Sequence, residues 1–255
     1  MSVALETRDL TIRFGGHTAV DRVSCSFRPG ELVAIVGPNG AGKTTYFNLI
    51  SGQLRASSGA VLLDGVDITN TSAPERARRG VGRAFQLTNL FPNLTVAENV
   101  RLAVQAAAGV HYDMLRPWTE RRDLIERADA VLKDVALTAK RGHAAAALPH
   151  GDQRKLEVAL MMALDPRVYM FDEPTAGMSV DEAPVVLDLI ARLKRDTEKI
   201  VLLVEHKMDV VRALADRIIV LVNGACVADG APAEVIASPI VQEAYLGMAP
   251  KGAAA

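Results

Sequence analysis

The nine residues from Gly37 to Thr45, "GPNGAGKTT", have the glycine, lysine and hydroxyl spacing that suits a phosphate chain. They follow a strand-like run, "ELVAIV", and precede a helix-like one, so their backbone N–H groups can converge on an anion. Lys43 would reach the β- and γ-phosphates of a nucleotide, and the Thr44 hydroxyl would ligate Mg²⁺. We therefore expect a phosphate site formed by Gly37, Pro38, Asn39, Gly40, Ala41, Gly42, Lys43, Thr44 and Thr45.

Two adjacent acids, Asp172 and Glu173, follow the apolar run "VYMF". At the end of a strand beside the phosphate loop, Asp172 can hold the metal ion. Glu173 can then lie within hydrogen-bond reach of the water that attacks the γ-phosphate. The pair predicts triphosphate hydrolysis, with Asp172 as metal ligand and Glu173 as catalytic residue; a solvated pair of loop acids is the alternative.

A second helix start lies at "LPHGDQR", residues 148–154, directly before the helix-like run "KLEVALMMAL". The first N–H groups of a helix have no partner within it, and the helix dipole favours negative charge at that end. The segment after Gly151 is therefore a second candidate anion site, far along the chain from the first.

The elements that must position these residues alternate in type. Strand-like runs occur before residue 70 and again after residue 165, where they alternate with helices, as in βαβ units. From about Ser72 to Leu164 helix formers dominate, and no strand of consequence is expected. The fold class is therefore α/β, a P-loop NTPase core with an N-terminal antiparallel β region and an inserted helical subdomain. We expect one domain over 1–255, with core segments 1–85 and 165–235, a helical subdomain at 86–164 and a short C-terminal extension at 236–255.

Composition narrows the class of partner. The net charge is −1, from 29 basic and 30 acidic residues, so we expect no nucleic acid among the partners. The run "RARR" at 76–79 is interpreted as a solvated helix face. Cys25 and Cys226 stand apart in the sequence and are interpreted as reduced structural thiols. The N-terminus has no signal-peptide pattern, and no apolar run approaches the roughly 18 residues of a membrane span. We expect a cytoplasmic protein that reaches a membrane through a partner.

Along nearly its whole length the sequence resembles the ATP-binding subunits of ABC transporters. "LPHGDQR" stands where that family carries its signature, about twenty residues before "MFDEP", and "AGMS" matches its D-loop. The resemblance implies ATP and Mg²⁺ as cofactors. It implies that Phe14 stacks on adenine, that His206 contacts the γ-phosphate, and that Gln86 senses the metal ion and the attacking water. Glu173, His206 and Gln86 are thus the expected catalytic residues, and Thr44, Gln86 and Asp172 the expected metal ligands.

In this family two ATPase subunits pair head to tail, and the signature of each faces the nucleotide held by the other. The resemblance therefore assigns the second helix start to a partner's nucleotide, through Pro149, His150, Gly151, Asp152 and Gln153.

Two positions depart from the family pattern. Pro149 replaces a serine whose hydroxyl bonds the γ-phosphate, which predicts a weakened site that Pro149→Ser would strengthen. Ser179 replaces the aspartate that many relatives carry in the D-loop.

Within the family, "RAFQLTNLFPNLTVAENV" and "ASPIVQEAYLG" resemble importers of branched-chain and other hydrophobic amino acids, or of urea and amides. That likeness implies a second ATPase subunit, identical or homologous, membrane permease subunits and, indirectly, an extracytoplasmic solute-binding protein. It also implies a place on the cytoplasmic face of the cell membrane. Leu90, Phe91 and Leu94 are expected to line the groove that receives the permease's coupling helix, with core packing as the alternative.

Two other functions stay open on the sequence. One is a non-transport ABC ATPase of the repair or translation type, although those usually carry tandem ATPase domains or a long coiled-coil insertion. The other is a regulatory subunit that binds ATP with low turnover, which Pro149 would favour.

Overall fold

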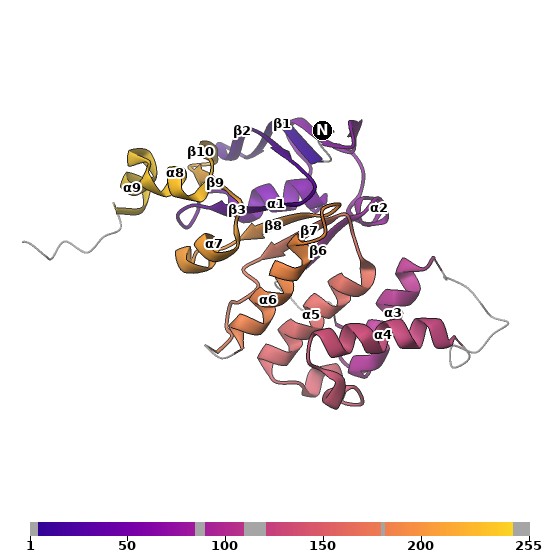
Figure 1. The fold of residues 1–255 in the computed structure, drawn as a ribbon. Coiled ribbons are helices and arrows are strands. Elements are labelled where there is room, and N and C mark those ends of the chain that lie inside the picture. The colour runs from indigo at the N-terminus through magenta and orange to yellow at the C-terminus, as the bar shows by residue number, and fades with distance from the viewer. Residues whose placement is uncertain (1–4, 85–89, 110–120, 180–181, 247–255) are drawn as a thin grey trace, which may run out of the picture.

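The computed structural model describes residues 5–84, 90–109, 121–179 and 182–246, and this part of the chain is organised around two β-sheets (Figure 1). The first sheet is antiparallel, with strand order β2-β1-β4-β5. Its strands are β1 (Leu5–Phe14), β2 (His17–Phe27), β4 (Ser58–Leu63) and β5 (Val66–Asp67). The second sheet has the order β10-β9-β3-β8-β7-β6 and is parallel except for β10. Its strands are β3 (Glu31–Val36), β6 (Val81–Ala84), β7 (Val168–Asp172), β8 (Ile200–Val204), β9 (Arg217–Val222) and β10 (Ala225–Gly230).

Helices cover both faces of the second sheet. They are α1 (Lys43–Ser51), α2 (Ala73–Arg78), α3 (Val96–Ala107), α4 (Arg122–Asp134), α5 (His150–Leu164), α6 (Ala183–Lys194), α7 (Met208–Leu214), α8 (Pro232–Ala237) and α9 (Pro239–Leu246). Two 3₁₀ turns, η2 (Thr138–Lys140) and η3 (Ala145–Ala147), connect α4 to α5. The α/β class with an antiparallel β region and helices between the strands is confirmed.

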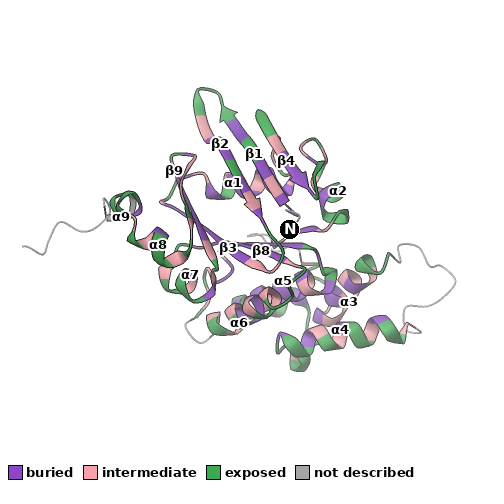
Figure 2. Cartoon of the chain, turned by 45° about the horizontal axis from the view of Figure 1, so that its top comes forward, coloured by how far each residue is buried: buried purple, intermediate pink, exposed green. Residues whose placement is uncertain are grey.

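Successive side chains along the strands of the second sheet point to opposite faces, so the sheet separates two layers of hydrophobic core. Val33 and Ile35 point to the face that carries α1, which lies between the two sheets and packs against both. Leu32, on the opposite face, packs with residues of α3, α4, α5 and α6. Because both faces are covered, the central strands are continuous apolar runs, and Figure 2 shows them as buried.

Helices α3, α4 and α5 do not form a separate hydrophobic core. Helix α3 packs against α4 and α5, and their buried side chains join one cluster with Tyr169 and Phe171 of β7. Figure 2 shows that α3 and α4 expose their outer sides, while α5 lies closer to the sheet. Helix α5 contacts α3, α4 and the edge strand β6, and so connects the outer helices to the side of the sheet where β7 carries Asp172.

Two expectations about this region are wrong. The stretch from Ser72 to Leu164 contains a strand, β6, which pairs in parallel with β7. Its sequence, "VGRA", is too short and too polar to show a strand pattern, and pairing with β7 fixes it. Arg76 is not on a solvated helix face but is 1% exposed. Its guanidinium donates to the carbonyl oxygens of Leu49 (2.6 Å) and Ile50 (2.7 Å) at the end of α1 and of Thr69 (2.7 Å).

The two cysteines meet across the sheets. Cys25 of β2 is buried, and Cys226 on β10, whose thiol donates to the Ala228 carbonyl oxygen (3.6 Å), packs against the same core cluster; both are free thiols. The interaction between the two thiols, together with burial, raises the pKa of Cys25, and the same interaction lowers the pKa of Cys226. Strands β9 and β10 form an antiparallel hairpin, with Asn223 and Gly224 between them. None of the helices within the described ranges is long and apolar enough to cross a membrane.

Candidate nucleotide site

The site lies at the carboxyl ends of the parallel strands, where an open α/β sheet usually binds its ligand. The phosphate loop follows β3, Asp172 ends β7 and His206 comes shortly after β8. Strand β8 lies between β3 and β7, so the three segments that follow these strands meet at the carboxyl end of the sheet.

The phosphate loop closes tightly against the strands beside it. Gly42 has φ 96° and caps α1, and a Cβ there would lie 2.3 Å from the carbonyl oxygen of Ala19. Only glycine fits this position, because both the left-handed conformation and the close carbonyl exclude a side chain. The Lys43 ammonium donates to the carbonyl oxygens of Gly37 (2.8 Å) and Pro38 (3.0 Å), which closes the loop over its own side chain. Burial lowers the pKa of Lys43, and the carboxylates of Glu173 and Asp172 oppose that shift.

An open cavity of about 270 Å³ lies over this loop. Most of the residues predicted to bind phosphate line it, together with Glu173 and two residues of β2. The lining residues are His17, Ala19, Asn39, Gly40, Ala41, Gly42, Lys43, Thr44, Thr45 and Glu173. The structure therefore brings the loop and the predicted catalytic acid to one cavity.

Glu173 has an unusual backbone. Its φ is 49°, a left-handed conformation that costs a residue with a Cβ roughly 1–2 kcal/mol, and its N–H donates to the Val204 carbonyl oxygen (2.9 Å). This bond to β8 holds the turn that directs Glu173 to the cavity. Its Oε1 lies 3.8 Å from Nδ1 of His206, so two predicted catalytic residues are adjacent. Gln86, the third, lies outside the described residues.

Asp172 is fully buried and asymmetrically bonded. Its Oδ2 accepts from Arg83 Nη2 at 3.0 Å, and its side chain is 0% exposed. Oδ1 is buried and has no hydrogen-bond partner within the ranges that the structure describes. Burial raises the pKa of Asp172, and Arg83 opposes the shift. An orphaned carboxylate oxygen close to the phosphate loop is a chemically suitable ligand for Mg²⁺ or for a water on Mg²⁺.

Sequence reasoning missed Arg83 and Glu205. Arg83 lies in β6, in the stretch where no strand was expected. Glu205 is 0% exposed and accepts from Thr175 Oγ1 (2.8 Å) and from the backbone N–H of His206 (3.0 Å), so it fixes the segments on either side of the site. For Glu205 the sequence offered one signal, a charged residue directly after the apolar run of β8.

The predicted signature lies at the start of α5, with Pro149 as N-cap residue. Gly151 is buried, and a Cβ there would lie 2.1 Å from Glu182 Oε1. Asp152 forms ion pairs with Lys140 and with Lys155 (3.0 Å).

The other signature side chains also have local neighbours. Gln153 Nε2 donates to the Leu148 carbonyl oxygen (3.0 Å), and His150 lies against Gly177. None of residues 149–153 lines the cavity over the phosphate loop of the same chain.

Phe14 ends β1 and is 51% exposed, so it is not part of the hydrophobic core. Leu90 is partly buried against the helical core, and with Leu160, Met161 and Leu164 it lines a cavity of about 150 Å³ at the end of β6. Phe91 beside it is 56% exposed. Leu90 therefore packs partly against the helical core, whereas Phe91 is exposed to solvent.

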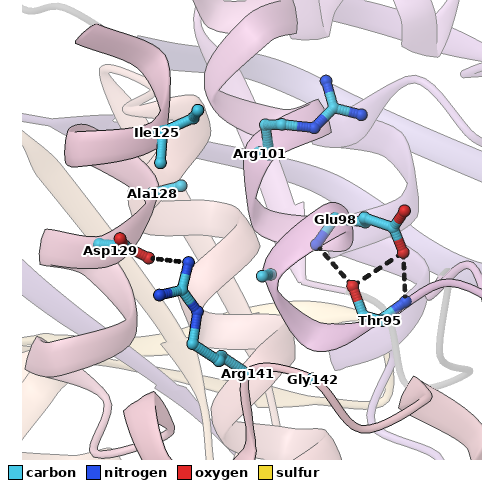
Figure 3. A pocket seen from close by; sticks show the side chains of 9 residues that line it. Thr95, Glu98, Arg101, Ile125, Ala128, Asp129, Arg141 and Gly142 are labelled. Atoms are coloured by element: carbon cyan, nitrogen blue, oxygen red, sulfur yellow. Dashed lines mark hydrogen bonds and ion pairs between the residues drawn. The ribbon is translucent and has the colours of Figure 1, made fainter. Parts of the chain in front are cut away.

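Another cavity, of about 260 Å³, lies between α3 and α4 (Figure 3). Its charged groups have partners within the chain: Arg141 pairs with Asp129 (2.9 Å), and Glu98 accepts from the N–H and hydroxyl of Thr95 (2.8 Å each). It shares no lining residue with the cavity over the phosphate loop.

Comparison with known proteins identifies this arrangement. A family model described as "ABC transporter" matches residues 20–176, and one described as "Branched-chain amino acid ATP-binding cassette transporter" matches residues 226–247. The chain is 38% identical to the high-affinity branched-chain amino acid transport ATP-binding protein BraF of Pseudomonas aeruginosa. It is 37% identical to LivG of Escherichia coli, and each alignment covers 96% of this chain and 98% of the relative.

Solved structures agree. The ADP conformation of an ATP-binding cassette of an ABC transporter matches with a TM-score of 0.81 and 29% identity, over 96% of this chain and 98% of that one. A dimeric, post-hydrolysis cassette bound to ADP and Pi matches with a TM-score of 0.76 and 26% identity, over 89% and 98%. The predicted family is confirmed: this chain belongs to the ABC transporter family and is an ATP-binding subunit whose ATPase activity is coupled to transport.

Proposed function

We propose that this subunit drives the import of branched-chain or closely similar hydrophobic amino acids, by binding and hydrolysing Mg²⁺·ATP between two ATPase subunits. The observation that carries the ATPase part is the cavity lined by both the phosphate loop and Glu173, with His206 beside Glu173. The relatives named for branched-chain amino acid transport, and the C-terminal family match, support the solute class.

The chemistry follows from the positions of these side chains. Backbone N–H groups of the loop and Lys43 bind the phosphates and neutralise charge that develops on the γ-phosphate. Glu173 orients a water, which attacks the γ-phosphorus while the bond to the β-γ bridging oxygen breaks, leaving ADP and inorganic phosphate. His206, 3.8 Å from Glu173, can donate to a γ-phosphate oxygen. Phe14, exposed at the end of β1, can stack on the adenine ring.

Mg²⁺ would be held by Thr44, by Asp172 through its orphaned Oδ1, and by Gln86. When bound, it would supply positive charge that offsets the negative charge of the phosphates. Thr44 lines the cavity, and Asp172 is held by Arg83 beneath it. These side chains fit a hard cation, because their donors are oxygen atoms.

The second half of each site would come from another ATPase subunit. The start of α5 would present N–H groups and a positive dipole end once the Glu182 carboxylate beside buried Gly151 moves aside, and it does not line its own chain's cavity. A related cassette forms a dimer with ADP and Pi. We propose that ATP joins two chains head to tail and that hydrolysis separates them, so differential binding of ATP and ADP drives the motion.

Transport requires permease subunits, and we place their contact at Phe91 and the cavity lined by Leu90 and Leu164. Leu164 is 43% exposed and lines this cavity, and Phe91, which follows Leu90 directly, is 56% exposed, so apolar side chains from two segments are open to a partner here. The subunit would then sit on the cytoplasmic face of the membrane, and a solute-binding protein would act on the other side. The proposed division is a core (1–85, 165–235), a permease-facing helical part (86–164) and an extension (236–255).

Uptake by the reconstituted complex tests this function. The chain is co-purified with its permease subunits, placed in liposomes with ATP, and supplied with radiolabelled leucine or, as a control solute, glutamate. We expect ATP-dependent leucine uptake that falls at least a hundredfold in Glu173→Gln and is unchanged in Glu198→Gln, an exposed acid outside the site. Equal uptake by Glu173→Gln would refute its catalytic role, and absence of leucine uptake by an ATPase-active complex would refute the solute class.

A further inference from the structure

Arg83 connects three parts of the nucleotide site. Its side chain is 7% exposed and leaves β6 to reach Asp172 at the end of β7, where Nη2 donates to Oδ2 at 3.0 Å. Nη1 donates to Asn48 Oδ1 and to Ser51 Oγ (3.2 Å), and the guanidinium lies over the ring of Phe47, 5.7 Å from its centroid. These three partners belong to α1, the helix that begins at Lys43.

We infer that Arg83 is a positioning residue: it fixes Asp172 relative to α1, and thereby fixes the distance between Thr44 and Asp172, two of the groups proposed to bind the metal ion. Thr44, in the first turn of α1, and Asp172, on β7, come from elements with few direct contacts to each other. A single planar guanidinium bonded to both elements fixes their spacing. This inference rests on the Mg²⁺·ATP site proposed above.

The burial of this ion pair argues against a purely stabilising role. Removing two charged groups from water costs several kcal/mol, so a buried pair often contributes less than an apolar pair of similar volume. What a buried pair does supply is orientation. With Oδ2 occupied by Arg83, the carboxylate cannot rotate freely, and Oδ1 stays without a partner among the described residues. The second oxygen is therefore held ready for an incoming cation.

Arginine suits this position better than lysine. The guanidinium offers separate N–H groups in a rigid plane, so one side chain can bond α1 and β7 together, and its face can rest on an aromatic ring. An ammonium at the end of a flexible stem could pair with Asp172 or with Asn48 but would not hold both at a fixed angle. We therefore expect Arg83→Lys to restore only part of the function that Arg83→Met removes.

The test measures how strongly Mg²⁺ tightens nucleotide binding by the purified full-length chain. A fluorescent ADP analogue is titrated in EDTA and in saturating Mg²⁺, and the ratio of the two dissociation constants is the readout. For Arg83→Met we expect this ratio to fall at least tenfold, while the EDTA affinity stays within twofold of wild type. Arg83→Lys should give an intermediate ratio.

Two further variants serve as a control and as an alternative test. Arg76→Met removes another buried arginine bonded to α1 but not to Asp172, so its ratio should match that of wild type. If Arg83→Met fails to fold, Asn48→Ala, which removes one anchor of the guanidinium, should still lower the ratio about threefold. An unchanged ratio in Arg83→Met overturns the inference, as does an equal loss of affinity with and without Mg²⁺. If Arg83→Met does not fold, an unchanged ratio in Asn48→Ala overturns it instead. A wild-type chain insensitive to Mg²⁺ would refute the proposed metal site itself.

Discussion

Replacing Pro149 by serine tests the second half of the nucleotide site. Pro149 is the N-cap residue of α5, with φ −55° and ψ 155°, a conformation that serine also adopts at helix starts. A serine hydroxyl there can accept from the N–H of Asp152 and still donate its own hydrogen to an anion. The substitution therefore requires no change in the backbone and adds one donor at the position that would face a partner's γ-phosphate.

The substitution has two separate effects, one on the stability of the isolated chain and one on ATPase turnover. The cap bond would stabilise the isolated chain by about 1 kcal/mol, or about 2–4 °C in Tm for a chain of this size. The loss of proline's rigidity offsets this by roughly 0.4–1 kcal/mol. A hydrogen bond to a charged phosphate contributes about 1.5–3 kcal/mol, which corresponds to about a tenfold to hundredfold change in turnover.

The assay compares Pro149→Ser with Pro149→Ala, which removes the proline ring without adding a hydroxyl. Thermal unfolding of the isolated chain reports the cap, and ATPase turnover of the permease-bound complex reports the phosphate contact. We expect the serine variant to exceed the alanine variant by about 2–4 °C in Tm and to exceed both alanine and wild type by at least tenfold in turnover. Turnover equal to or below wild type would show that the start of α5 does not face a γ-phosphate.

Three other outcomes are expected. Arg76→Met removes the charged donor to three carbonyl oxygens, of which that of Leu49 keeps a bond from the Gly52 N–H, and should lower the free energy of unfolding by about 1–3 kcal/mol; no measurable loss in urea denaturation would contradict its role in capping α1. At pH 8 iodoacetamide should alkylate the half-buried Cys226, whose pKa is lowered, and spare buried Cys25, whose pKa is raised; mass spectrometry showing the reverse order would refute this assignment of the two thiols. Phe91→Ser should weaken co-purification with the permease and leave ATP binding by the isolated chain unchanged; full retention of the permease would exclude Phe91 from that interface.

The conformation of the phosphate loop was predictable because it depends on contiguous residues. Gly42, Lys43 and Thr44 act through a strand, a turn and a helix that a short sequence window reveals. The α/β class was predictable for the same reason, since the apolar runs of β3, β7 and β8 are each buried on both faces.

The supporting contacts were not predictable, because each joins residues far apart in the chain. Arg83 bonds Asp172 across 89 positions, and its strand exists only by pairing with β7. Arg76 looked like part of a solvated charge run, and only the tertiary fold brings the end of α1 within reach of its guanidinium. The meeting of Cys25 with Cys226 likewise depends on how the two sheets pack.

A crystal structure of the Glu173→Gln variant with Mg²⁺·ATP would test the central claim most directly. We expect a two-fold dimer in which the γ-phosphate bound by Lys43 of one chain accepts from the N–H at Gly151 of the other, within about 3.2 Å. A nucleotide held by Lys43 with Gly151 of every neighbouring chain more than about 10 Å away would contradict the shared site, since no direct or single-water contact spans that distance.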